Sequence, residues 1–149
     1  MKKIVLSIFA TIFTVMAFAQ QNPVNWSYEA KKKTADTYEV IITAEVEQPW
    51  HLYSQNTGKG GPIPTTISFK ANPLINKSGA VKELGKLEKN YDENFKTDVL
   101  YYSDKVQFVQ TVKVKGGVKT NISGTIEYMV CNDSKCLPPV KKSFDLKLM

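Results

Sequence analysis

The sequence of 149 residues contains no arginine: all 20 of its basic residues are lysines, against 14 acidic residues. It also has only one histidine and two cysteines. One histidine excludes a histidine-rich metal cluster and argues against a Ser-His-Asp triad. Two cysteines are too few for a disulfide-dense miniprotein or for a zinc site of their own. The 42% hydrophobic and 23% charged residues are typical of a folded domain and exclude a disordered or collagen-like chain.

Long apolar runs are absent except at the N-terminus. Lys2 and Lys3 precede a run of about 15 mostly apolar residues, which ends at Ala17-Phe18-Ala19 before a polar segment. A basic start, an apolar stretch and a small-x-small site predict a secretory signal peptide over residues 1–19, cleaved after Ala19. The alternative is an uncleaved membrane anchor, but this needs about 20 apolar residues.

Cleavage leaves one domain, residues 20–149. Loss of the first 19 of the 149 residues leaves 130, and loss of Lys2 and Lys3 lowers the formal net charge from +6 to +4. No later segment is long and apolar enough for stable insertion into a membrane. We therefore expect a soluble, exported, periplasmic monomer in a compartment where disulfides form.

The positive charge does not indicate a nucleic-acid partner. The lysines are scattered along the chain, with short clusters only at residues 31–33 and 141–142. Arginine, which makes most bidentate phosphate and base contacts, is missing. We interpret the lysines as a solvated surface, where those on edge strands also oppose aggregation between sheets.

The dominant hydrophobic period of the remaining chain is two, which predicts half-buried strands. Alternation is clearest over residues 38–46, 106–114, 122–130 and 144–148, and shorter strand candidates are 26–29, 50–53, 65–69 and 80–84. About 7–9 short strands without an amphipathic helix predict an all-β fold, an immunoglobulin-like antiparallel β-sandwich. A closed barrel is the alternative.

Turn signals separate these strands. Gly116-Gly117, between two alternating segments, predicts a hairpin, while residues 58–62 and 72–73 predict a loop and a turn. Residues 87–102 hold aromatic side chains but no clear period, so we expect a long irregular loop. Its composition favours a surface loop whose aromatics pack into the core, although long loops in compact domains often carry functional sites.

The cysteine segment is the most informative part of the sequence. Cys131 and Cys136 flank Asn132-Asp133-Ser134-Lys135, residue types typical of a turn, so we place them on adjacent antiparallel strand ends. A bond between them closes a short ring and stabilises the fold by about 2 kcal/mol. The pattern leaves open a local structural bridge, a redox-active pair or metal ligation. Metal ligation is the weakest, since only His51 could join the cysteines.

Three segments resemble the N-terminal periplasmic domain of the thiol–disulfide interchange protein DsbD. They are Trp50-His51-Leu52-Tyr53, Tyr91-Asp92-Glu93-Asn94-Phe95, and the stretch from Tyr128 to Pro139 that holds both cysteines. The resemblance implies an immunoglobulin-like fold with one redox cysteine pair and no cofactor, associated with cytochrome c biogenesis. In that family the domain takes electrons from a membrane-embedded thiol reductase and passes them to exported thioredoxin-like proteins through mixed disulfides.

The resemblance also implies roles for individual residues. Cys136 is the cysteine that bonds to the partner, and Cys131 resolves the mixed disulfide. A cap loop of Asp92, Glu93, Asn94 and Phe95 closes over the pair, with Phe95 shielding the sulfurs. His51 and Tyr53 occupy pocket positions where the family tends to have two tyrosines.

The sequence departs from the family in ways that matter for function. The family lid often carries two acids directly before the aromatic, whereas Asn94 separates Glu93 from Phe95 here. The chain ends at Met149, so we expect either that the electron donor is a separate chain or that the domain has been reused. If the disulfide is only structural, the alternative is a non-catalytic immunoglobulin-like binding module; a thiol-based sensor or metal-handling protein is a third reading.

Overall fold

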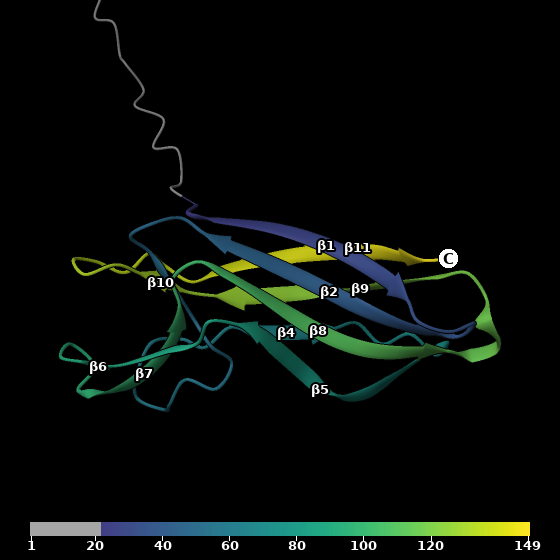
Figure 1. Cartoon of the computed structure of the whole chain (residues 1–149), viewed down its shortest axis with the longest axis horizontal. Coiled ribbons are helices and arrows are strands. Elements are labelled where there is room, and N and C mark those ends of the chain that lie inside the picture. Colours follow the sequence, from purple (N-terminus) through teal and green to yellow (C-terminus); the bar gives the residue numbers. More distant parts are fainter. Residues whose placement is uncertain (1–21) are drawn as a thin grey trace, which may run out of the picture.

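The structure is a computed structural model that describes residues 22–149 (Figure 1). The predicted signal peptide, residues 1–19, therefore lies outside the described residues. Eleven strands and one short 3₁₀ turn, η1 (Lys115–Gly117), make up the described chain. The strands are β1 (Val24–Lys32), β2 (Thr37–Val46), β3 (His51–Tyr53), β4 (Thr66–Phe69), β5 (Ile75–Gly85), β6 (Glu88–Asp92), β7 (Thr97–Tyr102), β8 (Lys105–Val114), β9 (Thr120–Tyr128), β10 (Val130–Cys131) and β11 (Val140–Leu148).

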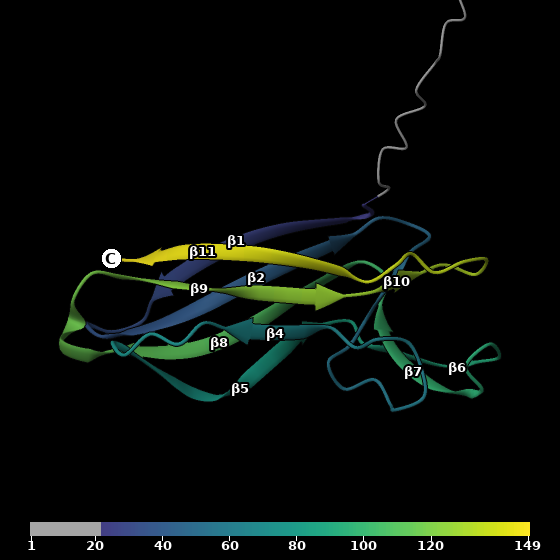
Figure 2. The same ribbon diagram turned by 180° about the vertical axis from the view of Figure 1, so that it is seen from behind.

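Two antiparallel sheets form the body of the molecule. The first has the strand order β1-β2-β8-β5 and the second the order β11-β9-β4. The first sheet lies in front of the second in Figure 1 and behind it in Figure 2. The predicted immunoglobulin-like antiparallel β-sandwich is confirmed, with more strands than the expected 7–9 because several are only two to five residues long. In residues 22–149 no helix is long and apolar enough to cross a membrane.

The core lies between the two sheets and is built from the alternating residues of the long strands. Val40, Ile42 and Phe108 face it from the first sheet, and Ile126 and Tyr128 from the second. All five are at most 1% exposed. Full burial of a large apolar side chain stabilises the folded state by about 1.5–3 kcal/mol, so this core is the main source of stability. The period-two prediction for residues 38–46, 106–114 and 122–130 is confirmed.

A glycine sets the close packing at the centre of the second sheet. Gly124 pairs with Phe144 on β11 and with Phe69 on β4. A Cβ at Gly124 would strike the Ser68 carbonyl oxygen and lie 2.8 Å from Cζ of Phe144. The missing side chain lets the Phe144 ring lie over β9 and meet Phe69 edge-on, with 5.7 Å between ring centroids.

The hairpin predicted at Gly116-Gly117 is wrong. Strands β8 and β9 do not pair; η1 carries the chain from the first sheet to the second. Gly116 and Gly117 adopt φ values of +66° and +60°, which glycine tolerates without a steric penalty. Two alternating strands joined by a tight turn face the same core whether they pair or lie in opposite sheets, so the local pattern could not distinguish these arrangements.

The irregular loop predicted for residues 87–102 is also wrong. Strands β6 and β7 pair as a hairpin from Glu88↔Tyr101 to Asp92↔Thr97, and only the turn at residues 93–96 is irregular. The sequence shows no hydrophobic period of two here, because β6 buries no residue fully and β7 buries only Val99 and Tyr102. The strand predicted at 80–84 is the end of the longer β5, whose register shifts between Ser78 and Lys82.

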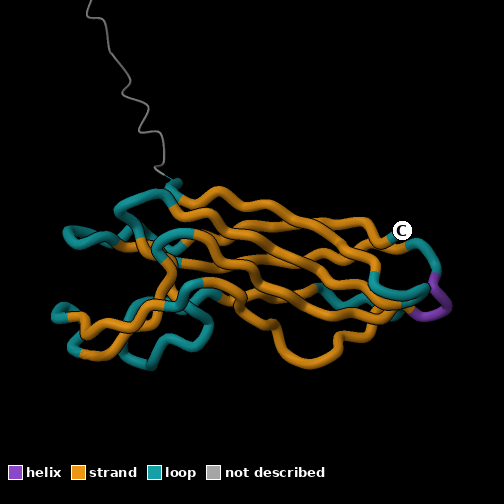
Figure 3. The backbone as a smooth tube through the Cα atoms, in the orientation of Figure 1, coloured by secondary structure: helices purple, strands orange, loops and turns teal. Residues whose placement is uncertain are grey.

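A third sheet, of order β10-β3-β7-β6, lies at one end of the sandwich, on the left in Figures 1 and 3. Its strands continue those of the body: β3 follows β2, β7 precedes β8, β6 follows β5, and β10 follows β9. Three of them thus extend the first sheet, while β10 comes from the second. This end sheet joins the two layers and brings Cys131 beside His51.

Candidate functional site

The two cysteines form a disulfide at the rim of the end sheet. Cys131, in β10, and Cys136 have 3.9 Å between their Cα atoms and face each other in an antiparallel bridge. On its other side, β10 pairs with β3 in the register Val130↔Leu52 and Cys131↔His51. The predicted placement on antiparallel strand ends holds for Cys131, whereas Cys136 forms an isolated antiparallel bridge before β11 begins at Val140.

The turn between the cysteines is closed by its own hydrogen bonds. Asn132 Oδ1 accepts hydrogen bonds from the backbone N–H groups of Ser134 and Lys135, both at 2.9 Å. The Asn132 N–H donates to the Lys135 carbonyl at 2.9 Å, and the Leu137 N–H donates to the Val130 carbonyl at 2.9 Å. Asparagine suits such turns because its side chain mimics a backbone acceptor. The turn therefore holds both sulfurs in reach of one another.

The two sulfurs differ in their surroundings. Cys131 is only 4% exposed and packs in a small cluster with Tyr53, Val99, Tyr101 and Met129. Cys136, by contrast, is exposed. Because exchange requires a thiolate to approach a disulfide sulfur, an outside thiol reaches Cys136 more readily than Cys131.

The β6–β7 turn faces the disulfide across a cleft. The cleft has a volume of about 170 Å³; Asp92, Asn94 and Phe95 line it on one side, and the cysteine turn with both cysteines on the other. Asp92 Oδ1 accepts hydrogen bonds from the backbone N–H groups of Asn94 at 2.8 Å and of the half-buried Phe95 at 3.2 Å. Three of the four predicted cap-loop residues thus line the disulfide cleft, while Glu93 lines the neighbouring cavity.

A polar cavity of about 210 Å³ lies next to this cleft. His51 and Tyr53, the predicted pocket residues, line it together with Tyr101, Asp92 and Glu93, among others. Burial, with a smaller effect of Asp92 and then Tyr101, raises the pKa of Tyr53 to about 12. Burial also raises the pKa of Tyr101, followed by the charges of Glu88 and Asp133. Both phenols therefore stay protonated at neutral pH.

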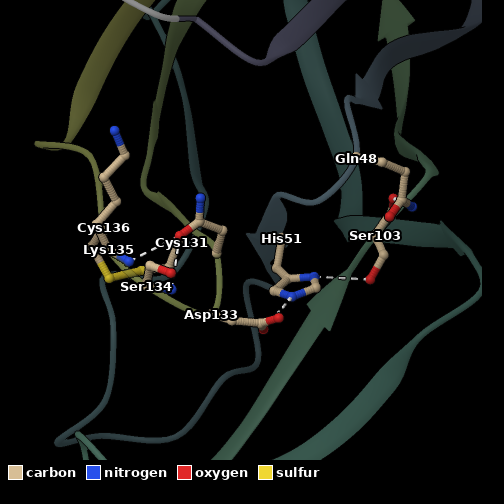
Figure 4. Close-up of polar contacts among 9 residues, drawn as sticks. Gln48, His51, Ser103, Cys131, Asp133, Ser134, Lys135 and Cys136 are labelled. Carbon is tan, nitrogen blue, oxygen red and sulfur yellow. Dashed lines mark hydrogen bonds and ion pairs between the residues drawn. A yellow bond between two sulfur atoms is a disulfide. The ribbon is translucent and has the colours of Figure 1, made fainter.

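The only histidine of the sequence has a hydrogen-bond partner at one ring nitrogen and a carboxylate near the other (Figure 4). His51 Nδ1 lies 3.0 Å from Ser103 Oγ, and Nε2 lies 3.9 Å from Asp133 Oδ1. The ring also packs against Tyr101, with 4.5 Å between ring centroids. The sequence prediction included neither Ser103 nor Asp133. The position of Asp133 between the cysteines was a usable signal, whereas Ser103 is 52 residues from His51 and gave none.

Glu83 is a second residue that the sequence did not reveal. Its carboxylate accepts hydrogen bonds from the Ser54 hydroxyl and the Gln55 N–H, both at 2.7 Å, and from the Tyr102 hydroxyl at 2.8 Å. Burial, and then the bond to Glu83, raises the pKa of Tyr102. These contacts fasten the segment after β3 to β5 and β7, and so fix the strand that carries His51.

A metal site normally needs three or four grouped protein ligands. Within residues 22–149, no three or more histidine, cysteine, aspartate or glutamate side chains are grouped in that way. The two sulfurs are bonded to each other, and metals bind thiolates. The arrangement present is a disulfide between one exposed and one buried cysteine.

Two solved structures share the fold of this chain. The N-terminal domain of DsbD from Neisseria meningitidis, in the reduced form, is 20% identical with a TM-score of 0.54, over 81% of this chain and 83% of that chain. The N-terminal periplasmic domain of ScsB from Proteus mirabilis is 14% identical with a TM-score of 0.57, over 89% of this chain. This chain covers 49% of that ScsB chain, about half of its length. At these identities the likeness concerns the fold.

A search of curated proteins gave no match. A family model, by contrast, matches nearly the whole described chain. The family model described as "Thiol:disulfide interchange protein DsbD, N-terminal" matches residues 17–148, which include both cysteines, the β6–β7 turn and His51. The chain therefore belongs to the family of the N-terminal domain of the thiol:disulfide interchange protein DsbD.

Proposed function

We propose that this protein is an exported, periplasmic thiol–disulfide exchange module comprising residues 20–149 after removal of a signal peptide. It relays reducing equivalents through Cys131 and Cys136 from a membrane-embedded thiol reductase to thioredoxin-like proteins. The observation that carries the proposal is the disulfide between an exposed and a buried cysteine within one short turn. Family membership supports the same chemistry.

The exchange proceeds through two displacements at sulfur. In the reduced module, the Cys136 thiolate attacks a partner disulfide; a bond forms from Cys136 Sγ to one partner sulfur, and the other leaves as a thiolate. The Cys131 thiolate then attacks Cys136 Sγ, which re-forms the module's disulfide and releases the partner as a dithiol. Two electrons have passed to the partner. A donor dithiol attacks Cys136 in the same way to reduce the module again.

The division of labour between the cysteines follows from their burial. The exposed Cys136 meets partners, and the buried Cys131 resolves the mixed disulfide within the turn. The β6–β7 turn acts as a cap, with Phe95 shielding the sulfurs until a partner displaces it. The shared cleft between Phe95 and both cysteines supports this role.

The reduction potential tests whether the disulfide takes part in exchange. A relay must lie near its partners, at about −200 mV, whereas a structural disulfide lies below about −300 mV. The measurement is the fraction of oxidised protein at equilibrium with glutathione buffers of graded composition. A potential below the structural limit would favour the alternative, an immunoglobulin-like binding module with a structural bridge.

A trapping experiment tests the roles of the two cysteines. In Cys131→Ser, the Cys136 mixed disulfide is left without its resolving thiol, so an adduct with a thioredoxin-like protein accumulates on non-reducing gels. Cys136→Ser is the matched control and should give no adduct, because its remaining thiol is buried. Absence of an adduct from Cys131→Ser, together with a potential below the structural limit, would contradict the relay.

A further inference from the structure

The buried cysteine poses a chemical problem that rests on the proposed function. The nucleophile in disulfide exchange is the thiolate, and apolar surroundings oppose its formation. Cys131 packs among Tyr53, Val99 and Met129, yet it must ionise to resolve a mixed disulfide at Cys136. It therefore needs a neighbouring group that takes up its proton.

His51 is the direct cross-strand neighbour of Cys131. The two residues face each other in the β10–β3 ladder. Side chains of directly opposed residues point to the same face of a sheet, with Cβ atoms about 4.5–5.5 Å apart. An imidazole is also the side chain that ordinarily exchanges protons between about pH 5 and pH 8. The register therefore places the single histidine of the sequence beside the thiol that has to ionise.

We propose that His51 accepts the proton of the Cys131 thiol during resolution, and that Ser103 and Asp133 position its ring for this step. In this arrangement Nδ1–H donates to Ser103 Oγ, at 3.0 Å, which leaves Nε2 free to accept the proton. The imidazolium that forms faces the Asp133 carboxylate, 3.9 Å from Nε2 (Figure 4). A base oriented by a third group is the usual arrangement around an activated nucleophile.

The step balances without a co-reactant. The proton moves from Cys131 Sγ to His51 Nε2, and the thiolate attacks Cys136 Sγ. The Cys131–Cys136 bond forms, and the bond from Cys136 to the partner breaks. The partner sulfur leaves with the electron pair, and the imidazolium then releases its proton to the leaving thiolate or to water.

Charged and titratable groups face His51 from several elements. Groups facing the same cavity are Asp133 in the cysteine turn, Asp92 and Glu93 on the β6–β7 turn, Tyr53 on β3 and Tyr101 on β7, with Glu88 acting on Tyr101. The tyrosines are neutral near pH 7, so the charged neighbours are carboxylates. The ammonium of Lys135 lies instead over the Trp50 ring, 5.8 Å from its centroid.

Asp92 also lines the disulfide cleft, where its Oδ1 accepts backbone hydrogen bonds from Asn94 and Phe95.

An aromatic disulfide reagent tests the proposal without any protein partner. Reduced protein mixed with 5,5′-dithiobis(2-nitrobenzoate) releases one thionitrobenzoate when Cys136 attacks and a second when Cys131 resolves the adduct. The rate of each release is followed by absorbance from about pH 5.5 to about pH 9. Cys131→Ser should release only the first, which identifies the second phase.

His51→Gln should slow the second release at least about tenfold near pH 6.5, because a positioned general base contributes a factor of about 10² or more. The difference should shrink as the pH rises toward about 9, because hydroxide increasingly removes the thiol proton without the imidazole. The first release should not change. Equal slowing at every pH would indicate lost packing against Tyr101, and superimposable profiles would indicate no role; either result overturns the proposal.

Two further variants keep the histidine and protect the test against misfolding of His51→Gln. Ser103→Ala and Asp133→Asn should each slow the second release near pH 6.5 by a smaller factor and leave the first unchanged. Asp145→Asn, which removes an exposed carboxylate on β11, is the matched control for Asp133→Asn and should match the unmodified protein. If neither Ser103→Ala nor Asp133→Asn slows the second release, the positioning roles of Ser103 and Asp133 are wrong. The assay contains this protein and a small reagent only. Its result therefore does not depend on whether the protein exchanges electrons with partner proteins.

Discussion

The strands of the end sheet continue those of the sandwich body along the chain, but the two regions are stabilised differently. In the body, β1 and β2 pair from Val24↔Val46 to Lys32↔Tyr38, and apolar residues fill the space between the sheets. In the end sheet, the β10–β3 and β3–β7 ladders have two residue pairs each. Its own buried cluster consists of Tyr53, Val99 and Cys131, while Leu52, Tyr102 and Val130 pack against the main core. Polar contacts and one disulfide add to this burial.

This contrast lets one domain combine stability with redox chemistry. Regions with few buried apolar contacts open locally at a small cost in free energy, while the global core stays folded. A disulfide in the end sheet is therefore able to break and re-form while the sandwich body keeps its packing.

The largest effect is expected in the body. Phe108 is fully buried on β8 and stacks on Trp26, with 6.1 Å between ring centroids. Phe108→Ala should lower the free energy of unfolding by about 3–5 kcal/mol, through lost burial and the cavity left behind. Urea denaturation measures this change. The reduction potential of the disulfide should stay the same, and a shift in it would show that the two regions are coupled.

Removal of the disulfide should have a smaller effect. The Cys131→Ala/Cys136→Ala variant should lose about 2 kcal/mol, because the closed ring is short and restrains the unfolded chain little. Urea denaturation again provides the measurement, with hydrogen exchange to locate the change. Protection should fall in the end sheet and persist in β2, β8 and β9. A variant that fails to fold would mean that the disulfide is a structural staple of the whole domain.

Alkaline pH should destabilise the end sheet through Tyr53. Its pKa is raised to about 12, above the ordinary phenol value, so its buried neutral form contributes stability below about pH 10. That contribution is lost as the pH rises from about 10 through about 12. Tyr53→Phe should therefore unfold at a higher pH in alkaline titrations followed by circular dichroism. Tyr91→Phe, at a half-exposed site, is the control and should behave like the unmodified protein.

The smallest effect on stability is expected at the tip of the β6–β7 hairpin. Phe95→Ala should change the free energy of unfolding by less than about 0.5 kcal/mol, because the ring is half-buried and outside both apolar clusters. It should nevertheless speed alkylation of the reduced cysteines by iodoacetamide. Leu87→Ala, an exposed apolar residue before the same hairpin, should not. An unchanged alkylation rate for Phe95→Ala would mean that Phe95 does not shield the sulfurs.

Sequence patterns predicted the body more accurately than the end sheet. The strands around Val40, Phe108 and Ile126 were predicted because half-buried strands show a clear period of two. The β6–β7 hairpin was missed because it buries so few residues that no period appears. The Gly116-Gly117 turn was misassigned, since a tight turn between alternating strands fits either a hairpin or a crossing between sheets.

In the candidate site, too, residues with local contacts were predicted and residues with distant partners were missed. Cys131, Cys136 and the turn between them were predicted because all the contacts that close the turn are local. The cap-loop and pocket residues were identified through family resemblance. The structure places Asp92, Asn94 and Phe95 at the disulfide cleft and Glu93, His51 and Tyr53 at the neighbouring cavity. Ser103 and Glu83 were missed because their partners lie between 19 and 52 residues away.

The all-β class, the positions of the long strands and the closed turn between the two cysteines are all predictable from local patterns. Each of these depends on side-chain periodicity or on contacts within a few residues. The pairing of β10 with β3, opposite His51, depends instead on the three-dimensional fold. Strand order and register across sheets are set by burial of residues far apart in the chain, which a local pattern does not encode.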